Sequence, residues 1–241
     1  MQFLTRIPVQ SEGHYSEARM AEIPRYFPLV GAIIGTAGAA VFLVTSEWLG
    51  LLSSVLISCA VTLALTGAFH EDGLADTFDG IGGGHSKARA LEIMRDSRLG
   101  TYGTLAVVVA LLLKVALLTE LPPRYVPIAL VLGHALSRLS SVLVLTHGRY
   151  VRDEGTGKPV AQGLSSKSMW VATVTAMAIA ALAWLLIGTI PVMTALGMML
   201  AAHALLRTWI ERKIDGYTGD TLGSIQQASE LGCYLGLALW L

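Results

Sequence analysis

The sequence predicts an all-α protein: a polytopic transmembrane bundle of about seven helices with a polar cavity that faces the cytoplasm. Of its 241 residues, 54% are hydrophobic and only 14% are charged, and the mean hydropathy is +0.61. Soluble domains carry roughly 25% charged residues, so this composition favours a membrane protein. Neither an internal repeat nor a shift in composition divides the chain, and we expect residues 1–241 to form a single integral membrane domain. The net charge of +0 gives no reason to expect a nucleic-acid partner.

Seven runs have about the 20 apolar residues that a helix needs to cross ~30 Å of hydrocarbon. They predict helices over 26–48, 50–69, 101–121, 125–147, 169–190, 191–210 and 221–241. Prolines at 122, 123 and 191 mark the tight connections between neighbouring runs. The final run is the weakest, because its first half carries several polar residues. Two Gly-xxx-Gly spacings, one beginning at Gly31 and one at Gly232, would let these helices pack closely against neighbours.

Basic residues predict the orientation of the bundle. With a cytoplasmic N-terminus, the inner segments are 1–25, 70–100, 148–168 and 211–220, and they hold thirteen lysines and arginines. The outer connections hold only Arg124. This asymmetry follows the positive-inside rule and places the acidic segment that follows the second run on the cytoplasmic side.

That acidic segment, residues 70–80, has the sequence His-Glu-Asp-Gly-Leu-Ala-Asp-Thr-Phe-Asp-Gly. Asp72, Asp76 and Asp79 follow i, i+4, i+7 spacing, so they share one face of a helix. Three like charges on one face repel one another unless a cation lies among them, and carboxylate oxygens suit Mg2+ or Mn2+. We therefore expect the three aspartates to bind a divalent metal, with Glu71 as a further ligand or a supporting group. The plain alternative, a solvated acidic loop, does not explain the helical spacing.

A second constellation, Met-Arg-Asp-Ser-Arg-Leu-Gly-Thr-Tyr-Gly, covers residues 94–103 and opens the third apolar run. Guanidinium groups pair bidentately with phosphate oxygens, and the N-terminus of a helix adds partial positive charge. We expect Arg95 and Arg98 to bind phosphate, with Asp96 as a candidate general base or additional ligand. The alternative is a positively charged membrane anchor with a local Asp–Arg pair.

Two further polar residues lie within an apolar run or directly before one. Arg138 lies in the fourth run, about two to three turns from its cytoplasmic end, so it must face the bundle interior or extend to the interface. It could bind substrate phosphate or be the structural partner of a carboxylate. Asp220 precedes the last run, where Asp220, Gln227 and Glu230 recur at helical spacing and are expected to line a cavity. Capping of the helix is the simpler role for Asp220.

Enzymes of phosphoryl transfer commonly combine carboxylates, a divalent metal and arginines in one site. A carboxylate that is not needed as a ligand can orient or deprotonate the attacking hydroxyl. Asp79 and Asp96 are the candidates for that catalytic role. The glycines at 80–84 lack the lysine and hydroxyl residue of a Walker loop, so they do not indicate a P-loop nucleotide site.

The two segments quoted above, together with Thr-Gly-Asp-Thr-Leu-Gly at 218–223 and Phe-Leu-Thr-Arg-Ile-Pro-Val at 3–9, resemble the motifs of adenosylcobinamide-GDP ribazoletransferases. These enzymes are also called cobalamin synthases or cobalamin 5′-phosphate synthases. The resemblance extends over almost the whole chain, with the motifs in the same order. It implies a late step of cobalamin biosynthesis at the bacterial inner (cytoplasmic) membrane, with the active site facing the cytoplasm.

The reaction that the resemblance implies joins α-ribazole, or its 5′-phosphate, to adenosylcobinamide-GDP and releases GMP. Its product is adenosylcobalamin or the 5′-phosphate of adenosylcobalamin, and Mg2+ is the implied cofactor. The expected partners are these two substrates and the lipid bilayer, and a homo-oligomer is compatible with the sequence.

Two other functions remain as alternatives. The Asp-Gly-Leu-Ala segment at 72–75 resembles the Asp-Gly-x-x-Ala motif of CDP-alcohol phosphotransferases. Such an enzyme would need an arginine where this chain has Asp76, and a further Gly-x-x-x-Asp-x-x-x-Asp pattern that is not present. A cation transporter would place its acidic residues near the bilayer midplane, whereas the cluster here follows the end of an apolar run.

Overall fold

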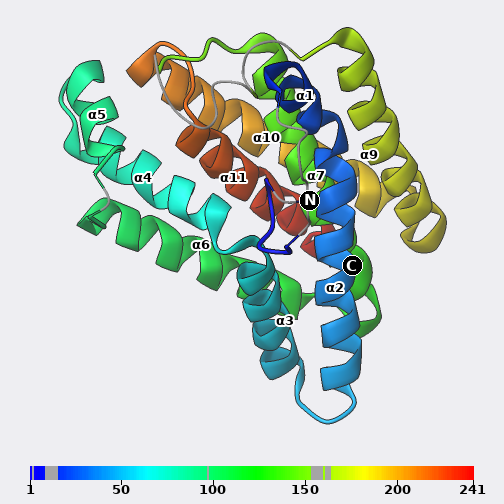
Figure 1. The fold of residues 1–241 in the computed structure, drawn as a ribbon. Helices are drawn as coiled ribbons and strands as arrows, with labels where there is room; N and C mark the ends of the chain where they lie inside the picture. The colour runs from blue at the N-terminus through cyan, green and yellow to red at the C-terminus, as the bar shows by residue number, and fades with distance from the viewer. Residues whose placement is uncertain (2, 9–15, 97, 153–159, 161–163) are drawn as a thin grey trace.

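The structure is a computed structural model, and it describes the chain apart from residues 2, 9–15, 97, 153–159 and 161–163. The described part is built from helices, which confirms the all-α prediction (Figure 1). The helices are α1 (Glu17–Glu22), α2 (Phe27–Ser46), α3 (Leu51–Thr66), α4 (Phe69–Gly83), α5 (Lys87–Ile93), α6 (Thr101–Glu120), α7 (Val126–His147), α9 (Ser166–Ile187), α10 (Thr189–Ile214) and α11 (Gly219–Ala238). Short 3-10 turns, Ile23–Tyr26 and Pro123–Tyr125, lead into α2 and α7.

Every predicted apolar run contains a helix, but the count of seven spans is not confirmed. Among the described residues, five helical segments are long and apolar enough to cross a membrane: Arg19–Ser46, Thr101–Glu120, Pro123–His147, Ser166–Ile187 and Thr189–Ile214. A sixth is possible only if α3 and α4 are taken together, and that pair is bent by 85°. The helix α3 has 16 residues, which is short of a full crossing.

The bend between α3 and α4 has a local cause. Gly67 and Ala68 both adopt left-handed backbone conformations, with φ angles of 64° and 56°. Gly67 caps the C-terminus of α3, the place where a glycine without Cβ most easily takes this conformation. The turn sends α4, which carries the acidic motif, away from the direction of α3 and alongside α6 (Figure 1).

The last helix, α11, lies at the centre of the bundle rather than at its edge. It packs against α10, α7, α4 and α6, and most of its side chains are buried. Because other helices cover it, its polar side chains meet protein partners instead of lipid. This central position explains why the first half of the last apolar run is polar, the feature that made this run the weakest of the predicted spans.

The two predicted glycine spacings do form close helix contacts. A Cβ atom at Gly31 or Gly35 would overlap the backbone of α7, and one at Gly232 or Gly236 would overlap the backbone of α10. These glycines therefore set how closely α2 approaches α7 and how closely α11 approaches α10.

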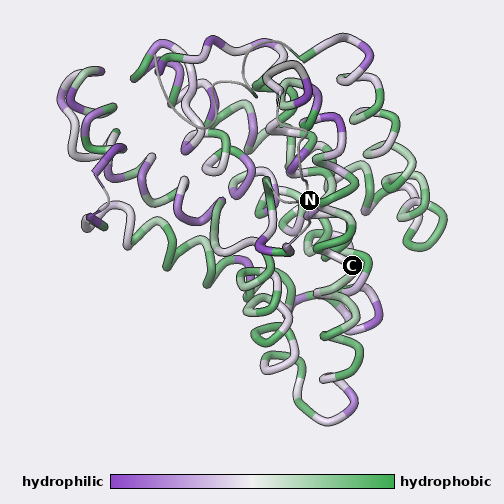
Figure 2. The backbone as a smooth tube through the Cα atoms, in the orientation of Figure 1, coloured by the Kyte–Doolittle hydropathy of each residue, from purple (hydrophilic) through white to green (hydrophobic). Residues whose placement is uncertain are grey.

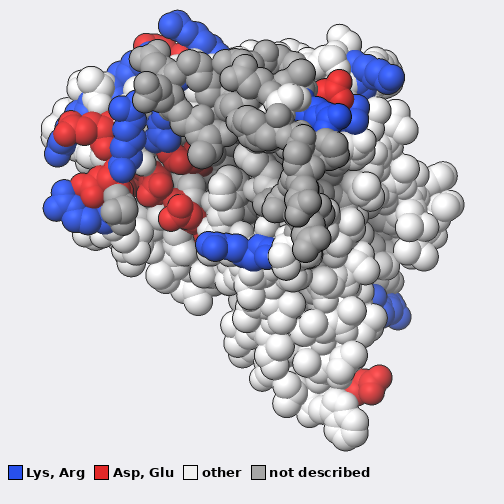
Figure 3. All heavy atoms as spheres, in the orientation of Figure 1, with Lys and Arg blue, Asp and Glu red and all other residues white. Residues whose placement is uncertain are grey.

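Polar and apolar surfaces are separated on the molecule. Hydrophilic residues are concentrated in α4, α5 and the connections at the top of the view, whereas α2, α3, α6 and α9 are largely hydrophobic (Figure 2). Charged side chains gather over α4 and α5, and the lower part of the same view is almost free of them (Figure 3). Only 22% of the apolar window of α6 and 28% of those of α9 and α10 are buried. Such broad exposed apolar surfaces suit a multi-pass membrane protein.

Candidate active site

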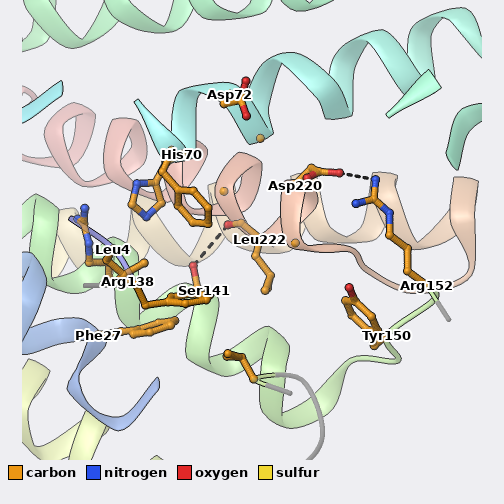
Figure 4. A pocket seen from close by; sticks show the side chains of 16 residues that line it. Leu4, Phe27, His70, Asp72, Arg138, Ser141, Tyr150, Arg152, Asp220 and Leu222 are labelled. Carbon is orange, nitrogen blue, oxygen red and sulfur yellow. Dashed lines mark hydrogen bonds and ion pairs between the residues drawn. The ribbon is translucent and has the colours of Figure 1, made fainter. Parts of the chain in front are cut away.

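A pocket lies where α4, α7 and the start of α11 meet the N-terminal segment, and we call it the arginine pocket (Figure 4). Its polar lining comes from four separate parts of the chain: α4, α7, the segment after α7, and α11. The polar residues are His70, Asp72, Arg138, Ser141, Tyr150, Arg152 and Asp220, and the phenylalanines are Phe3, Phe27 and Phe69. Three residues predicted from sequence, Asp72, Arg138 and Asp220, thus meet in one pocket.

Two glycines allow the N-terminal ends of α4 and α11, which carry Asp72 and Asp220, to lie close together. A Cβ atom at Gly73 would lie 2.6 Å from the carbonyl oxygen of Asp220, and one at Gly223 would lie 3.1 Å from that of His70. The backbones of α4 and α11 therefore approach more closely than larger residues would allow. This contact places Asp72 and Asp220 on the wall of the same pocket.

Arg152 reaches Asp220 through a short backbone pairing. The N–H of Val151 donates to the carbonyl of Tyr217 (3.0 Å), and the N–H of Tyr217 donates to that of Arg149 (2.9 Å). This pairing sets Arg152 beside Asp220, and the two form an ion pair (Figure 4). Burial raises the pKa of Asp220, and the Arg152 guanidinium opposes that shift. Arg152 was not predicted as a site residue, because it lies in the inner segment 148–168, which the sequence indicated only as a contributor to the positive charge of the cytoplasmic side; residues 153–159 and 161–163 of that segment fall outside the described residues.

Arg138 faces the bundle interior, one of the two options that the sequence left open. Its residue exposure is 1%, and its Nη1 donates to the carbonyl oxygen of His134 on the preceding turn (2.9 Å). Its buried Nε has no hydrogen-bond partner in the described part of the chain, and the same is true of the Nε of Arg152. Two guanidinium groups on one pocket thus retain unused donors, which an anionic ligand could accept.

The carboxylates on the acidic segment of α4 differ in whether they already have protein partners. Asp72 is exposed and lines the arginine pocket, and Asp76 interacts electrostatically with Asp72, Asp79, Asp220 and Arg152. The side-chain carboxylates of Asp72 and Asp76 accept no hydrogen bond and form no ion pair within the described residues. Their carboxylates are therefore free for a ligand.

Asp79 and Glu71 are engaged within the protein. The carboxylate of Asp79 accepts the backbone N–H groups of Gly100 (2.7 Å) and Gly103 (2.8 Å), so it caps the N-terminus of α6. Glu71 Oε1 accepts a hydrogen bond from Gln227 (2.9 Å) and lies 3.7 Å from Lys114 Nζ. The helix N-terminus that we expected to attract phosphate is thus already occupied by Asp79.

A metal site is compatible with these positions but is not preformed. No group of three or more His, Cys, Asp or Glu side chains in the described chain is arranged to hold a metal ion. Mg2+ is usually bound through one or two carboxylates together with water and substrate phosphate. Asp72 and Asp76 fit that pattern, because they are hard oxygen donors with free carboxylates beside the arginine pocket. Metal binding by Asp72, Asp76, Asp79 and Glu71 remains a prediction.

The second predicted constellation, residues 94–103, contributes no residue to the lining of the arginine pocket. Asp96 and Arg98 form an ion pair with each other, and the hydrogen bonds from Arg98 lower the pKa of Asp96 to about 2. A carboxylate of such low basicity, at the surface, has little support as the general base. Arg95 is exposed but close enough to Tyr150 of the pocket wall to interact with it electrostatically. Neither of the two predicted phosphate-binding arginines on this segment lines the arginine pocket.

A network of buried charged side chains lies beside the pocket. One of its members, Lys114, was not predicted from the sequence. The Lys114 Nζ lies 3.0 Å from Glu230 Oε1, and His134 Nδ1 lies 3.3 Å from Glu230 Oε2. Gln226 donates to Glu230 (2.7 Å), so Glu230 is surrounded by partners rather than facing a cavity. Lys114 lies in the middle of an apolar run, and a charge inside such a run is itself a signal of function or pairing.

Together, the apolar helical bundle and its pocket of arginines and carboxylates define an integral membrane protein with a site suited to phosphate-bearing substrates. Residues 1–238 match the Cobalamin-5-phosphate synthase family, and the chain belongs to that family. It is therefore a transferase of cobalamin biosynthesis, as its sequence motifs predicted.

The relatives named adenosylcobinamide-GDP ribazoletransferase are similar over nearly their full length. Those of Shewanella halifaxensis (strain HAW-EB4) and Shewanella piezotolerans (strain WP3 / JCM 13877) are each 41% identical, covering 99% of this chain and 93% of theirs. That of Shewanella amazonensis (strain ATCC BAA-1098 / SB2B) is 43% identical, covering 98% of this chain and 92% of its own. No solved structure matches the chain significantly.

Proposed function

We propose that this protein joins α-ribazole, or its 5′-phosphate, to adenosylcobinamide-GDP in a Mg2+-dependent reaction at the bacterial cytoplasmic membrane, with the site facing the cytoplasm. The hydroxyl oxygen of the ribazole forms a bond to the phosphorus that carries the corrinoid. The bond from that phosphorus to the bridging oxygen breaks, and GMP leaves with the electron pair. One proton is released from the hydroxyl, and the product is adenosylcobalamin or its 5′-phosphate. The names of the relatives support these substrates.

The observation that carries the proposal is the convergence of Arg138 and Arg152 on one pocket, each with an unpaired Nε. These groups would bind the oxygens of the diphosphate and hold it against α4. Asp220 keeps Arg152 in position through their ion pair. Asp72 and Asp76 would hold Mg2+, which offsets the negative charge that develops on the leaving phosphate.

The direct test is GMP release by the purified, lipid-reconstituted protein given adenosylcobinamide-GDP and α-ribazole. We expect release to need both substrates and Mg2+, and to stop when a chelator is added. Asp76→Asn should lower the rate on the order of 100-fold, because it removes a preorganised charge at the reacting phosphate. The matched control, Glu22→Gln, changes a surface ion pair with Arg25 and should leave the rate within about twofold. Absence of GMP release from a folded sample would reject the proposed substrates.

A further inference from the structure

A second hollow adjoins the arginine pocket, and we call it the acidic groove. It lies between the N-terminal segment, the α3–α4 corner and the first half of α6. Both hollows are lined by Phe3, Phe69 and Asp72, so Asp72 stands at the wall that they share. A reaction that joins two substrates needs two adjacent binding sites, and this chain offers two that meet at a free carboxylate.

The two hollows differ in charge. The arginine pocket is lined by two arginines and two aspartates, so its formal charge is balanced. The acidic groove is lined by Glu71 and Asp72 against a single arginine, Arg6. A diphosphate is repelled by a net negative lining and is better placed in the arginine pocket. A neutral ligand is not repelled by the negative charge of the groove.

The groove also contains an unused acceptor. Glu71 is 7% exposed, and its Oε1 is held by Gln227, but its buried Oε2 has no hydrogen-bond partner among the described residues. A buried acceptor without a partner is costly unless a ligand or water supplies a donor. A sugar hydroxyl is a donor of that kind. The other walls, Leu99, Val107 and Val108, are apolar and suit an aromatic base.

We propose that the acidic groove binds the acceptor nucleoside, with a ribose hydroxyl donating to Glu71 and the aromatic base against Val107, while the arginine pocket binds the diphosphate substrate. This inference rests on the proposed function. It accounts for the shared wall at Asp72, because the attacking hydroxyl and the phosphate must meet there from opposite sides. An attacking oxygen and a leaving oxygen lie roughly in line across the transferred phosphoryl group.

The experiment fills the groove and measures the KM of each substrate separately. Val107→Phe places a phenyl ring against the groove, and Val109→Phe makes the same change on the same helix, where residue 109 lines neither the groove nor the arginine pocket. We expect Val107→Phe to raise the KM for α-ribazole at least about tenfold and to leave the KM for adenosylcobinamide-GDP within about twofold. Val109→Phe should change neither.

A reciprocal variant and a second groove variant make the outcome decisive. Arg152→Gln should raise the KM for adenosylcobinamide-GDP without raising that for α-ribazole. Should Val107→Phe fail to fold, Leu99→Trp tests the same groove from a position that is 63% exposed and tolerant of bulk. The inference is overturned when groove variants raise the KM for the diphosphate substrate, or leave both KM values unchanged, in an active enzyme. Wild-type protein that releases no GMP would instead reject the proposed function itself.

Discussion

At the scale of single residues, Asp79 connects two motifs that are separate in the sequence. A Cβ atom at Gly100 or Gly103 would overlap the Asp79 carboxylate, so both positions accommodate it only as glycines. The acidic motif on α4 and the glycines that open α6 are therefore one structural unit. Negative charge at a helix N-terminus is stabilising, and here a single side chain accepts two of the backbone donors that a helix leaves unpaired.

This arrangement separates a capping role for Asp79 from its predicted roles as metal ligand and base. Asp79→Ala removes the cap and should lower the free energy of unfolding by about 0.5–2 kcal/mol. Asp79→Asn retains one oxygen acceptor and should lose less stability. Thermal unfolding in detergent, measured beside GMP release, tests both variants. A variant that keeps wild-type thermal stability but loses Mg2+-dependent turnover would support the ligand or base role instead.

At the scale of helices, the buried charge network holds four of them together. It consists of Glu71 on α4, Lys114 on α6, His134 and Arg138 on α7, and Gln226, Gln227 and Glu230 on α11. Two carboxylates lie among two cations, so the charges are matched within the described part of the bundle. Arg138 and Glu71 belong both to this network and to the walls of the two hollows. The network therefore positions side chains that line the two hollows.

Lys114→Met is the sharpest test of the network, because it keeps an unbranched side chain of similar size and removes the ammonium group. Breaking a buried pair leaves an uncompensated charge, which costs about 3–5 kcal/mol. We expect a large decrease in Tm in detergent. Leu113→Met is the matched control, since Leu113 is 47% exposed on the same helix and should leave Tm nearly unchanged. Equal Tm values for the two variants would show that Lys114 contributes no such pairing.

At the scale of the whole molecule, sequence reasoning succeeded where hydrophobic periodicity dominates. It located a helix in each apolar run and identified the glycines that set the α2–α7 and α10–α11 contacts. It could not locate pairings between distant segments, such as Lys114 with Glu230 or Arg152 with Asp220, because no local pattern encodes them. For the same reason it grouped Asp79 with Asp72 and Asp76. Helical spacing shows that the three aspartates share a face, but it does not show that the Asp79 carboxylate already accepts the N–H groups of Gly100 and Gly103.

The orientation of the bundle is a prediction about the whole molecule. Basic residues predict that the α4–α5 turn faces the cytoplasm and that the connection before α7 faces outward. The two native cysteines are free and buried, at 6% and 0% exposure, so they should give little background in labelling experiments. His85→Cys and Arg124→Cys place single reactive thiols at exposed positions on opposite predicted sides.

An impermeant maleimide applied to intact inner-membrane spheroplasts should label the thiol of Arg124→Cys and leave that of His85→Cys unlabelled. Permeabilisation should then expose the second thiol. This pattern would place α4, with Asp72 and Asp76, at the cytoplasmic face, because His85 lies two residues after the end of that helix. The reverse pattern would mean that the positive-inside rule gives the wrong orientation here, and that the diphosphate substrate must reach the arginine pocket from the outer face.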